Sequence, residues 1–458
     1  MKTSRSLREL AEFDVRTLAR VVAEGAAKAE DATRAHLEVI QAEDGALGAF
    51  AHIDPDHALE QACALDRYRL TGRPVGPLHG VPVALKDIID ARGLPCEYGT
   101  VLEEGRRPRE DAFLVSRLRQ AGAVILGKTV TTELAVYHPG KTRNPHDPER
   151  TPGGSSSGSA AAVAARMAPL AVGTQTNGST IRPASYCGVV GYKPSRGMIS
   201  RRGVLSQSPA LDTIGLFGRG LDDVALLGDV LAAYDSGDRA MQPTAAPRLS
   251  ALAVAKPLLR PNLAFVRTPV WDQADDDVKE GFGELMEVLG DAAETVDLPA
   301  PFADAHAMHR AIMLADLAKS FSRYYENGRD RLSDKLTGMI EEGRSILAVD
   351  YALAHDWIEV LSAGLNRLLD RFDAIITPAT TGEAPKGLSD TGSPAFCTLW
   401  TYCGAPAVTL PLLTGANGMP IGVQLVGRPG DDGRLLRTAS WLVGTLREDG
   451  RSQSHETA

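Results

Sequence analysis

Apolar and polar positions alternate along the chain in a way that predicts strands followed by helices. Residues 79–85 form a short apolar run, and residues 111–121 have helical spacing, with Asp111 as the expected N-cap and Gly122 closing the helix. A second apolar run, 123–126, predicts the next strand. This succession is typical of a sheet with helices on its faces. The same patterns predict helices over 29–42, 158–167, 275–289, 306–326, 351–371 and 432–445, and strands over 170–172, 263–266 and 374–377.

Turn-forming residues separate several of these elements. Apolar runs at 407–410 and 421–426 flank the sequence Gly-Ala-Asn-Gly at 415–418, and the Asn-Gly pair predicts a hairpin. Closely spaced X-Pro pairs disfavour helix in 144–152, so we expect a loop there. Residues 235–260 are rich in Pro and Ala and weakly patterned, which predicts a connector.

The chain is long enough for more than one domain. Its 458 residues exceed the roughly 250–300 at which a single core usually stops growing, yet its composition does not divide it into unlike halves. We therefore expect one α/β domain over residues 1–447, with a variable region at about 235–370. The polar segment 448–458 is expected to be a disordered tail.

Net charge and cysteine content help to exclude several classes of function. The net charge is −9 and basic residues are scattered in short pairs such as Arg106-Arg107, whereas nucleic-acid binding needs clustered positive charge. The N-terminus lacks the apolar core of a secretory signal, and no apolar run approaches the ~18 residues of a membrane span. Five widely spaced cysteines are typical of reduced thiols. We expect a cytoplasmic protein that binds a small molecule, without nucleic acid or membrane, and that could form a homodimer.

Two Gly/Ser-rich clusters, residues 153–159 and 173–179, bracket an Ala-rich segment, and Lys86 lies upstream at the end of an apolar run. A serine attacks a carbonyl only if a base removes its proton. A lysine can be that base where burial lowers its pKa and holds it neutral. The alternative for Lys86 is a surface position or an ion pair with Asp87. On the local pattern alone this alternative is favoured, because buried lysines are rare.

Each cluster also has other interpretations when taken alone. The Gly and Ser residues of 153–159 could cap the helix that follows. Residues 154–158 fit the G-x-S-x-G elbow of hydrolases with Ser156 as nucleophile, but that motif needs a preceding strand, and a Pro-rich loop precedes it here. A phosphate-binding loop would need a following Gly-Lys-Ser/Thr, which the cluster lacks.

Several segments together carry a more specific signal. They are residues 80–87 (GVPVALKD), 122–129 (GAVILGKT), 142–145 (TRNP), 151–161 (TPGGSSSGSAA), 187–195 (CGVVGYKPS) and 422–427 (GVQLVG). In sequence and order they resemble the amidase signature family. The resemblance covers most of the chain and is weakest in 235–370. It implies a three-layer α/β/α fold around a large mixed β-sheet.

The resemblance also implies a Ser-cisSer-Lys relay. By position, Ser179 is the acylated nucleophile, Ser155 is the bridging serine with a cis peptide bond, and Lys86 is the terminal base. An oxyanion hole is implied at the backbone N–H groups of Thr176, Asn177, Gly178 and Ser179. This cycle needs neither a metal nor an organic cofactor.

The second cluster departs from the family's common turn, Gly-Thr-Asp-x-Gly-Gly-Ser. Gln175 replaces the Asp and Asn177 replaces the first Gly, which is acceptable because Asn tolerates left-handed backbone. The usual arginine position holds Ile181, and Arg182 follows it. Arg182 could bind a carboxylate or carbonyl of the substrate, or it could brace the catalytic loop through an ion pair.

Pocket walls in this family come from its variable regions, so we expect them from 300–345 and 394–403. Phe396 and Trp400 are candidates to contact an aryl or short acyl group, with a place in the core as an equal alternative. Two histidines of the first region are expected on a helix surface, without a metal: His306 and His309.

We therefore predict an amidohydrolase. Its substrate would be a small carboxamide, extending to aryl or carboxylate-bearing amides, esters or carbamates, cleaved to a carboxylic acid and ammonia or an amine. An alternative is a glutaminase similar to the A subunit of glutamyl-tRNA amidotransferase, acting in a complex, although Gln175, Asn177 and Arg182 point away from it. A binding protein on the same scaffold is a third class, disfavoured by retention of the relay residues.

Overall fold

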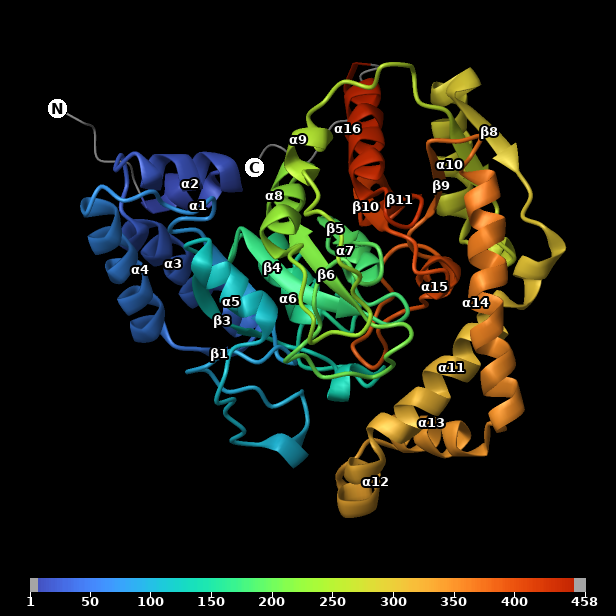
Figure 1. The fold of residues 1–458 in the computed structure, drawn as a ribbon, viewed down its shortest axis with the longest axis horizontal. Helices are drawn as coiled ribbons and strands as arrows, with labels where there is room; N and C mark the ends of the chain where they lie inside the picture. The colour runs from blue at the N-terminus through green and yellow to red at the C-terminus, as the bar shows by residue number, and fades with distance from the viewer. Residues whose placement is uncertain (1–6, 449–458) are drawn as a thin grey trace.

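Eleven strands form one mixed sheet in the computed structural model, which describes residues 7–448 (Figure 1). Their order across the sheet is β1-β3-β2-β4-β6-β5-β10-β11-β9-β7-β8. The strands are β1 (Phe50–Ile53), β2 (Pro82–Lys86), β3 (Val124–Thr129), β4 (Leu170–Gln175), β5 (Val190–Lys193), β6 (Thr213–Gly218), β7 (Leu263–Val266), β8 (Ala293–Val296), β9 (Ala374–Pro378), β10 (Ala407–Thr414) and β11 (Pro420–Val426).

Sixteen α-helices surround this sheet within the described residues. They are α1 (Leu7–Glu12), α2 (Val15–Ala23), α3 (Ala29–Leu47), α4 (Pro55–Leu70), α5 (Phe113–Gln120), α6 (Ser157–Ala164), α7 (Ile181–Tyr186), α8 (Leu221–Leu231), α9 (Leu249–Ala253), α10 (Asp276–Leu289), α11 (Ala305–Ser320), α12 (Ser322–Gly328), α13 (Asp334–Ser345), α14 (Ala348–Leu368), α15 (Ala395–Tyr402) and α16 (Asp432–Glu448). Helices α11 to α14 form a separate group at the lower right of Figure 1.

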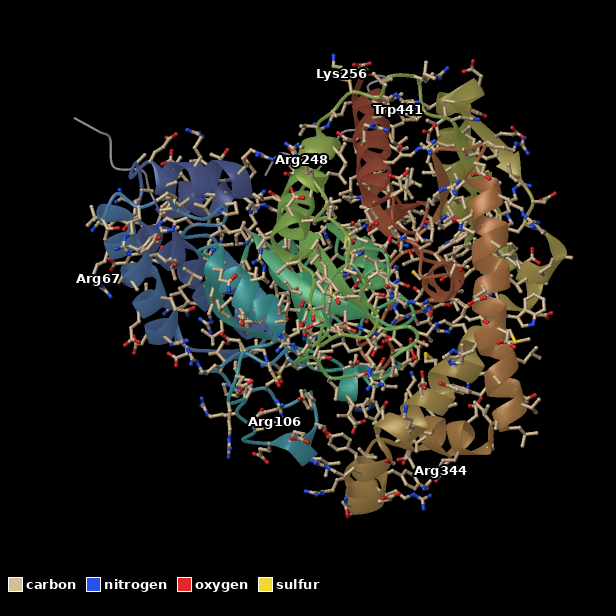
Figure 2. All side chains as sticks on the ribbon, in the orientation of Figure 1. Arg67, Arg106, Arg248, Lys256, Arg344 and Trp441 are labelled. Atoms are coloured by element: carbon tan, nitrogen blue, oxygen red, sulfur yellow. The ribbon has the colours of Figure 1, made fainter. Side chains whose placement is uncertain are left out.

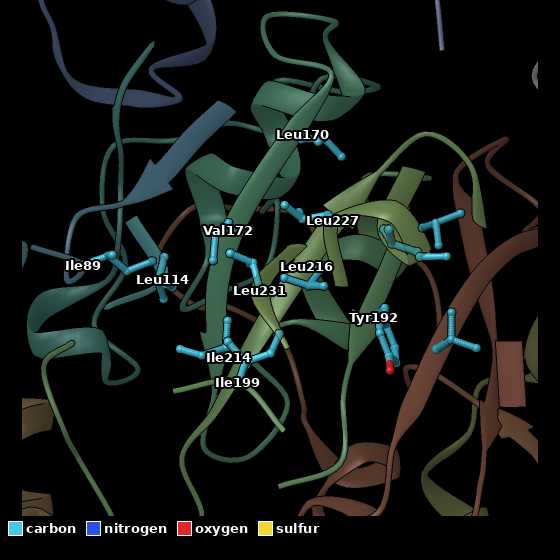
Figure 3. Packing of buried hydrophobic residues seen from close by; sticks show 14 of the residues in the cluster. Ile89, Leu114, Leu170, Val172, Tyr192, Ile199, Ile214, Leu216, Leu227 and Leu231 are labelled. Carbon is cyan, nitrogen blue, oxygen red and sulfur yellow. The ribbon is translucent and has the colours of Figure 1, made fainter. Parts of the chain in front are cut away.

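Alternate residues of the central strands face two different apolar cores. Val83 and Leu85 of β2 belong to the same cluster as Leu170 and Val172 of β4 and as apolar residues of α8 and α16. Figure 3 shows Leu170 and Val172 together with Leu227 and Leu231 of α8. Ala84 belongs to a second cluster with the alanines of α6. Because successive side chains of a strand point to opposite faces, helices cover both sides of the sheet. The predicted three-layer α/β/α fold is confirmed.

The middle of the sheet brings two strand ends together. β2 lies between β3 and β4 and runs parallel to both. The predicted succession of strand, helix and strand is therefore correct, with α5 connecting β2 and β3. β2 ends at Lys86 and β4 ends at Gln175, so the residues after both strands lie at the same edge of the sheet. Sites of open α/β sheets occur at such edges.

The predicted N-cap of α5 is wrong by one residue. Ala112 is the N-cap and makes no side-chain capping bond. Asp111 uses its carboxylate elsewhere: it accepts hydrogen bonds from the backbone N–H of Arg92, 2.7 Å away, and from Nε of Arg119, 3.0 Å away. Long-range partners therefore override the local capping preference of an aspartate.

Two predicted segments of the variable region also differ. The expected helix 306–326 is divided into α11 and α12 at Phe321, whose ring is fully buried in the main core. The expected connector 235–260 contains the short helix α9. Ion pairs of Asp235 and Asp238 with arginines after β5 hold the first residues of the connector. These contacts are long-range, so local patterning does not reveal them.

The C-terminal part follows the prediction closely. β10 and β11 pair antiparallel, as the Asn-Gly turn indicates, and α16 continues through Glu448. Glu448 is the first residue of the expected tail, and residues 449–458 lie outside the described part of the chain.

Basic residues are distributed over the surface. The cations labelled in Figure 2, which are Arg67, Arg106, Arg248, Lys256 and Arg344, lie on separate parts of the molecule from α4 to α13. Within residues 7–448, none of the helices combines the length and the apolar composition that crossing a membrane requires.

Candidate active site

Lys86, at the end of β2, is fully buried. Burial lowers the pKa of Lys86 to about 7, because the interior disfavours the charged ammonium. Its Nζ lies 2.7 Å from Oγ of Ser155 and 2.9 Å from Oγ1 of Thr174. The alternative of a surface position or an ion pair with Asp87 is wrong, since Asp87 instead accepts from Nζ of Lys128 at 2.9 Å. A neutral amine at this position can take the proton of the Ser155 hydroxyl.

The loop that precedes α6 holds Ser155 in place. The peptide bond between Gly154 and Ser155 is cis. Gly153 has φ +81°, and a Cβ there would lie 2.8 Å from Cα of Pro183, so a side chain would clash as well as strain the backbone. The hydroxyl of Ser157 donates to the carbonyl oxygen of Gly153 at 2.7 Å. The Gly/Ser cluster therefore builds a fixed loop in addition to starting a helix.

The turn after β4 presents Ser179, which is partly exposed. Oε1 of Gln175 accepts from the backbone N–H groups of Thr180 and Ile181, at 2.8 and 3.0 Å, where the first donors of α7 need partners. Its Nε2 donates to Oγ1 of Thr401 at 2.9 Å. A neutral glutamine can satisfy these donors and this acceptor at once, which explains how the turn is held without the family's aspartate.

Side chains hold Asn177 in the turn. Its Nδ2 donates to the hydroxyl of Tyr137 at 2.9 Å, and its Oδ1 accepts from Oγ1 of Thr398 at 2.7 Å. Its carbonyl oxygen accepts from Oγ1 of Thr401 at 2.6 Å. Asn177 is not one of the described residues with positive φ, so the expectation of left-handed backbone there is wrong. Replacement of the glycine therefore ties the turn to α15.

The turn after β4 contains backbone N–H groups that make no hydrogen bond within the described residues. Within residues 7–448, the N–H groups of residues 176–179 donate to no protein acceptor. They lie directly before α7, and Thr176, Asn177 and Ser179 line a pocket. Free N–H groups next to a serine hydroxyl are the arrangement that stabilises a developing oxyanion.

Asp212, which sequence reasoning did not single out, anchors the same turn. Its Oδ1 accepts from Oγ1 of Thr176 at 2.7 Å. Its Oδ2 accepts from the hydroxyl of Ser206 at 2.9 Å and from the backbone N–H groups of the two residues that follow. Burial raises the pKa of Asp212, although these hydrogen bonds oppose the rise. Its negative charge in turn raises the pKa of Lys86 against the larger effect of burial.

Arg182 is buried in α7, and protein oxygens occupy its guanidinium. Its Nη2 donates to the carbonyl oxygen of Gly154 at 2.6 Å and to Oγ1 of Thr391 at 3.2 Å. Its Nη1 donates to the carbonyl oxygen of Gly392 at 2.8 Å. Arg182 therefore braces the Ser155 loop, through carbonyl and hydroxyl oxygens where an ion pair was expected.

One pocket brings the two serines together. Region 300–345 contributes three of its apolar side chains, as the sequence suggested. The lining residues are Ala135, Val136, Tyr137, Ser155, Thr176, Asn177, Ser179, Arg182, Gln207, Met313, Leu317 and Met339.

Phe396 and Trp400 do not line this pocket. Phe396 is buried in the main core, where its ring lies edge-on to that of Trp271 with centroids 6.4 Å apart. Trp400 is fully buried in a third apolar cluster together with Leu399 and Tyr402. Both rings occupy the core position that the sequence left open as an alternative, so we do not assign them to substrate binding.

The prediction that His309 lies on a helix surface is wrong. Its side chain is buried, and Nε2 lies 3.0 Å from the carbonyl oxygen of Thr176, to which it donates. Burial lowers the pKa of His309 to about 4, so the ring is neutral near pH 7. His306 is partly exposed and lies 2.9 Å from the carbonyl oxygen of Ala395. Helical spacing identifies α11 but not which of its faces the catalytic turn covers.

No local signal marks Asp212 or His309 as part of the site. Each is one residue of a common type, and each reaches the turn from a distant segment. An aspartate directly before an apolar strand, as Asp212 is before β6, is the nearest sequence hint. Both contacts depend on tertiary structure.

Comparison with known proteins identifies the family of the chain. The family model described as Amidase matches residues 31–436. The chain belongs to the Amidase family. Among curated family members, it is 34% identical to the A subunit of the glutamyl-tRNA(Gln) amidotransferase of Acidothermus cellulolyticus, in an alignment that covers 94% of each chain.

Solved structures of amidases share the fold. The chain is similar to 6-aminohexanoate cyclic dimer hydrolase, with a TM-score of 0.85 and 28% identity over 95% of this chain and 97% of that one. It is also similar to the peptide amidase of Stenotrophomonas maltophilia, with a TM-score of 0.83 and 29% identity over 96% and 98%. The protein is therefore an amidase-signature hydrolase that acts on C–N bonds.

Proposed function

We propose that this amidase hydrolyses a small carboxamide to a carboxylic acid and ammonia or an amine, through an acyl-serine intermediate. One observation carries the proposal. Nζ of Lys86 lies 2.7 Å from Oγ of Ser155, in a site where burial lowers the pKa of Lys86 to about 7. A lysine with such a pKa is substantially neutral at neutral pH and can serve as a general base.

The proposed cycle uses both serines. Oγ of Ser179 attacks the amide carbon and gives its proton to Ser155, which passes its own proton to neutral Lys86. The N–H groups of residues 176–179 stabilise the oxyanion of the tetrahedral intermediate. The relay then runs backwards, so that the leaving nitrogen is protonated as the C–N bond breaks. Water, activated by the same relay, hydrolyses the acyl group on Ser179.

The exposure of the two serines supports these separate roles. Ser155 is only 4% exposed and touches Lys86, whereas Ser179 is partly exposed in the pocket. A nucleophile must reach substrate, while a proton relay must exclude competing water.

Turnover of a panel of primary amides, anilides and esters tests the proposal, with the wild type compared with Ser179→Ala. We expect the substitution to lower kcat by roughly 10³-fold or more, because a triad acts as a unit. Ser345→Ala, at the exposed end of α13, is the matched control and should keep full activity. Labelling of Ser179 by a fluorophosphonate should follow the same pattern. Undiminished hydrolysis by Ser179→Ala would show that another residue is the nucleophile.

A glutaminase that acts in a complex is the second candidate. It is favoured by the 34% identity to the A subunit of a glutamyl-tRNA(Gln) amidotransferase over 94% of the chain. This function requires glutamine as the preferred amide and stable partner chains. Purification of the tagged protein, followed by comparison of glutamine with simple neutral amides, distinguishes the two. Glutamine preference together with stoichiometric partners would favour the glutaminase.

A further inference from the structure

One face of α11 contacts both the catalytic turn and the pocket. His309, Met313 and Leu317 are spaced by four residues, which places them along one side of the helix. His309 donates to the carbonyl oxygen of Thr176 at 3.0 Å, and the other two side chains line the pocket beside Ser179. The wall of the pocket and the support of the turn are therefore parts of one rigid element.

The rest of α11 fixes that wall in position. Asp316 accepts from the hydroxyl of Ser208 at 2.6 Å and from that of Tyr351 at 2.8 Å. Ser320 donates to the carbonyl oxygen of Gln207 at 3.0 Å. The bonds with Ser208 and Gln207 attach α11 to the same segment in which Asp212 holds the catalytic turn, and the bond with Tyr351 attaches it to α14. Hydrogen bonds on two sides thus orient the helix.

The wall offers apolar contact and a single charged side chain within the described residues. Met313, Leu317 and Met339 face the space next to Ser179. Arg182 is the single charged side chain among the lining residues within 7–448, and three protein oxygens already accept from it. Its Nε is buried and has no hydrogen-bond partner among the described residues. An ammonium placed here would lose its hydration next to the cation of Arg182, and a carboxylate would find most N–H groups of that guanidinium already bonded to protein oxygens.

We infer that α11 is the acyl-recognition element of this amidase, and that it selects an uncharged, apolar acyl group through Met313 and Leu317. The inference rests on the proposed acyl-serine mechanism. The flexible side chains of Met313 and Met339 can adapt to acyl groups of different shape.

Two probes of matched length test this inference: hexylphosphonofluoridate and 5-carboxypentylphosphonofluoridate. Each reacts by attack of Oγ of Ser179 on phosphorus, with formation of a P–O bond, loss of fluoride and transfer of the serine proton to the relay. The rate of labelling of Ser179 in the wild type, measured by intact mass, should be at least ~10-fold higher for the hexyl probe. In Leu317→Lys the carboxypentyl probe should become the faster of the two. Leu353→Ala, on the exposed side of α14, should leave the ratio unchanged.

The outcomes separate the inference from the function on which it rests. Equal labelling, or faster labelling by the carboxypentyl probe in the wild type, would overturn apolar selection and leave the acyl-serine mechanism standing. An unchanged preference in Leu317→Lys would remove α11 from acyl recognition. If neither probe labels Ser179, both the proposed function and the inference are wrong.

Discussion

Nη2 of Arg182 lies 2.6 Å from the carbonyl oxygen of Gly154, so the helix that follows Ser179 is bonded directly to the peptide group that precedes Ser155. The same guanidinium reaches Thr391 and Gly392 on a third segment. Arg182 therefore fixes the position of one serine relative to the other. This charged side chain near Ser179 thus positions the two serines of the proposed relay.

Replacement of Arg182 should weaken catalysis without changing which charges are accepted. In Arg182→Lys one ammonium cannot span three oxygens on two separate segments, because lysine lacks the planar fork of arginine. We expect kcat/KM to fall by roughly 10–100-fold, and by the same factor for neutral and carboxylate-bearing amides. Steady-state kinetics with a matched pair of amides measures both factors. A selective loss for the carboxylate-bearing amide would instead identify Arg182 as a substrate ligand.

The pH profile should reveal the state of Lys86. Its pKa is lowered to about 7, so kcat/KM should fall about tenfold per pH unit below that value as the amine becomes protonated and can no longer accept a proton. Lys193, which is also fully buried, is the matched control, because burial lowers its pKa to about 7 as well. The acidic limb should persist in Lys193→Met. Loss of the acidic limb in Lys193→Met would show that Lys193, and not Lys86, produces it.

Removal of the charge at Asp212 should move that limb. The carboxylate raises the pKa of Lys86, so in Asp212→Asn the pKa should fall further and the acidic limb should shift to lower pH. Asn keeps an oxygen that can accept from Thr176, which limits damage to the turn. Asp223 is another buried carboxylate, and it accepts from the backbone N–H of Val15. Asp223→Asn therefore provides the comparison. A shift to higher pH in Asp212→Asn would contradict the electrostatic role.

Burial of Lys86 should lower the stability of the folded protein at pH values where the unfolded lysine is charged. Its pKa is about 7 in the folded state against an ordinary 10.5, so the unfolded state binds more protons between these values and stability rises with pH across that window. Lys86→Met should therefore have a higher Tm than the wild type at pH 6, and the difference should shrink as the pH approaches 10. Thermal unfolding at four pH values measures this. Lys335→Met, at a half-exposed lysine of α13, should show no such trend. A difference in Tm that does not vary with pH would mean that Lys86 is not desolvated.

The sequence predicted most of the central fold because its signals there are local. The apolar run that ends at Lys86, the Gly/Ser clusters and the Asn-Gly hairpin each depend on neighbours in the chain, and the resemblance to the amidase signature placed Lys86, Ser155 and Ser179 in one proposed relay. Period and turn chemistry act over a few residues, so one sequence can show them. The boundary of α11 with α12 and the cap of α5 escaped prediction, because buried packing and distant arginines decided them.

The environment of the relay was decided by tertiary structure alone. Desolvation of Lys86 requires both apolar cores around the sheet, and the charge that opposes it comes from Asp212 in another segment. Likewise, only the packing of α11 shows that His309 is buried against the turn, while Phe396 and Trp400 lie in the core. Residue types and their spacing specify which groups are available for chemistry. Burial and long-range hydrogen bonds then set the pKa and position of each group, since both depend on neighbours that the chain supplies only when folded.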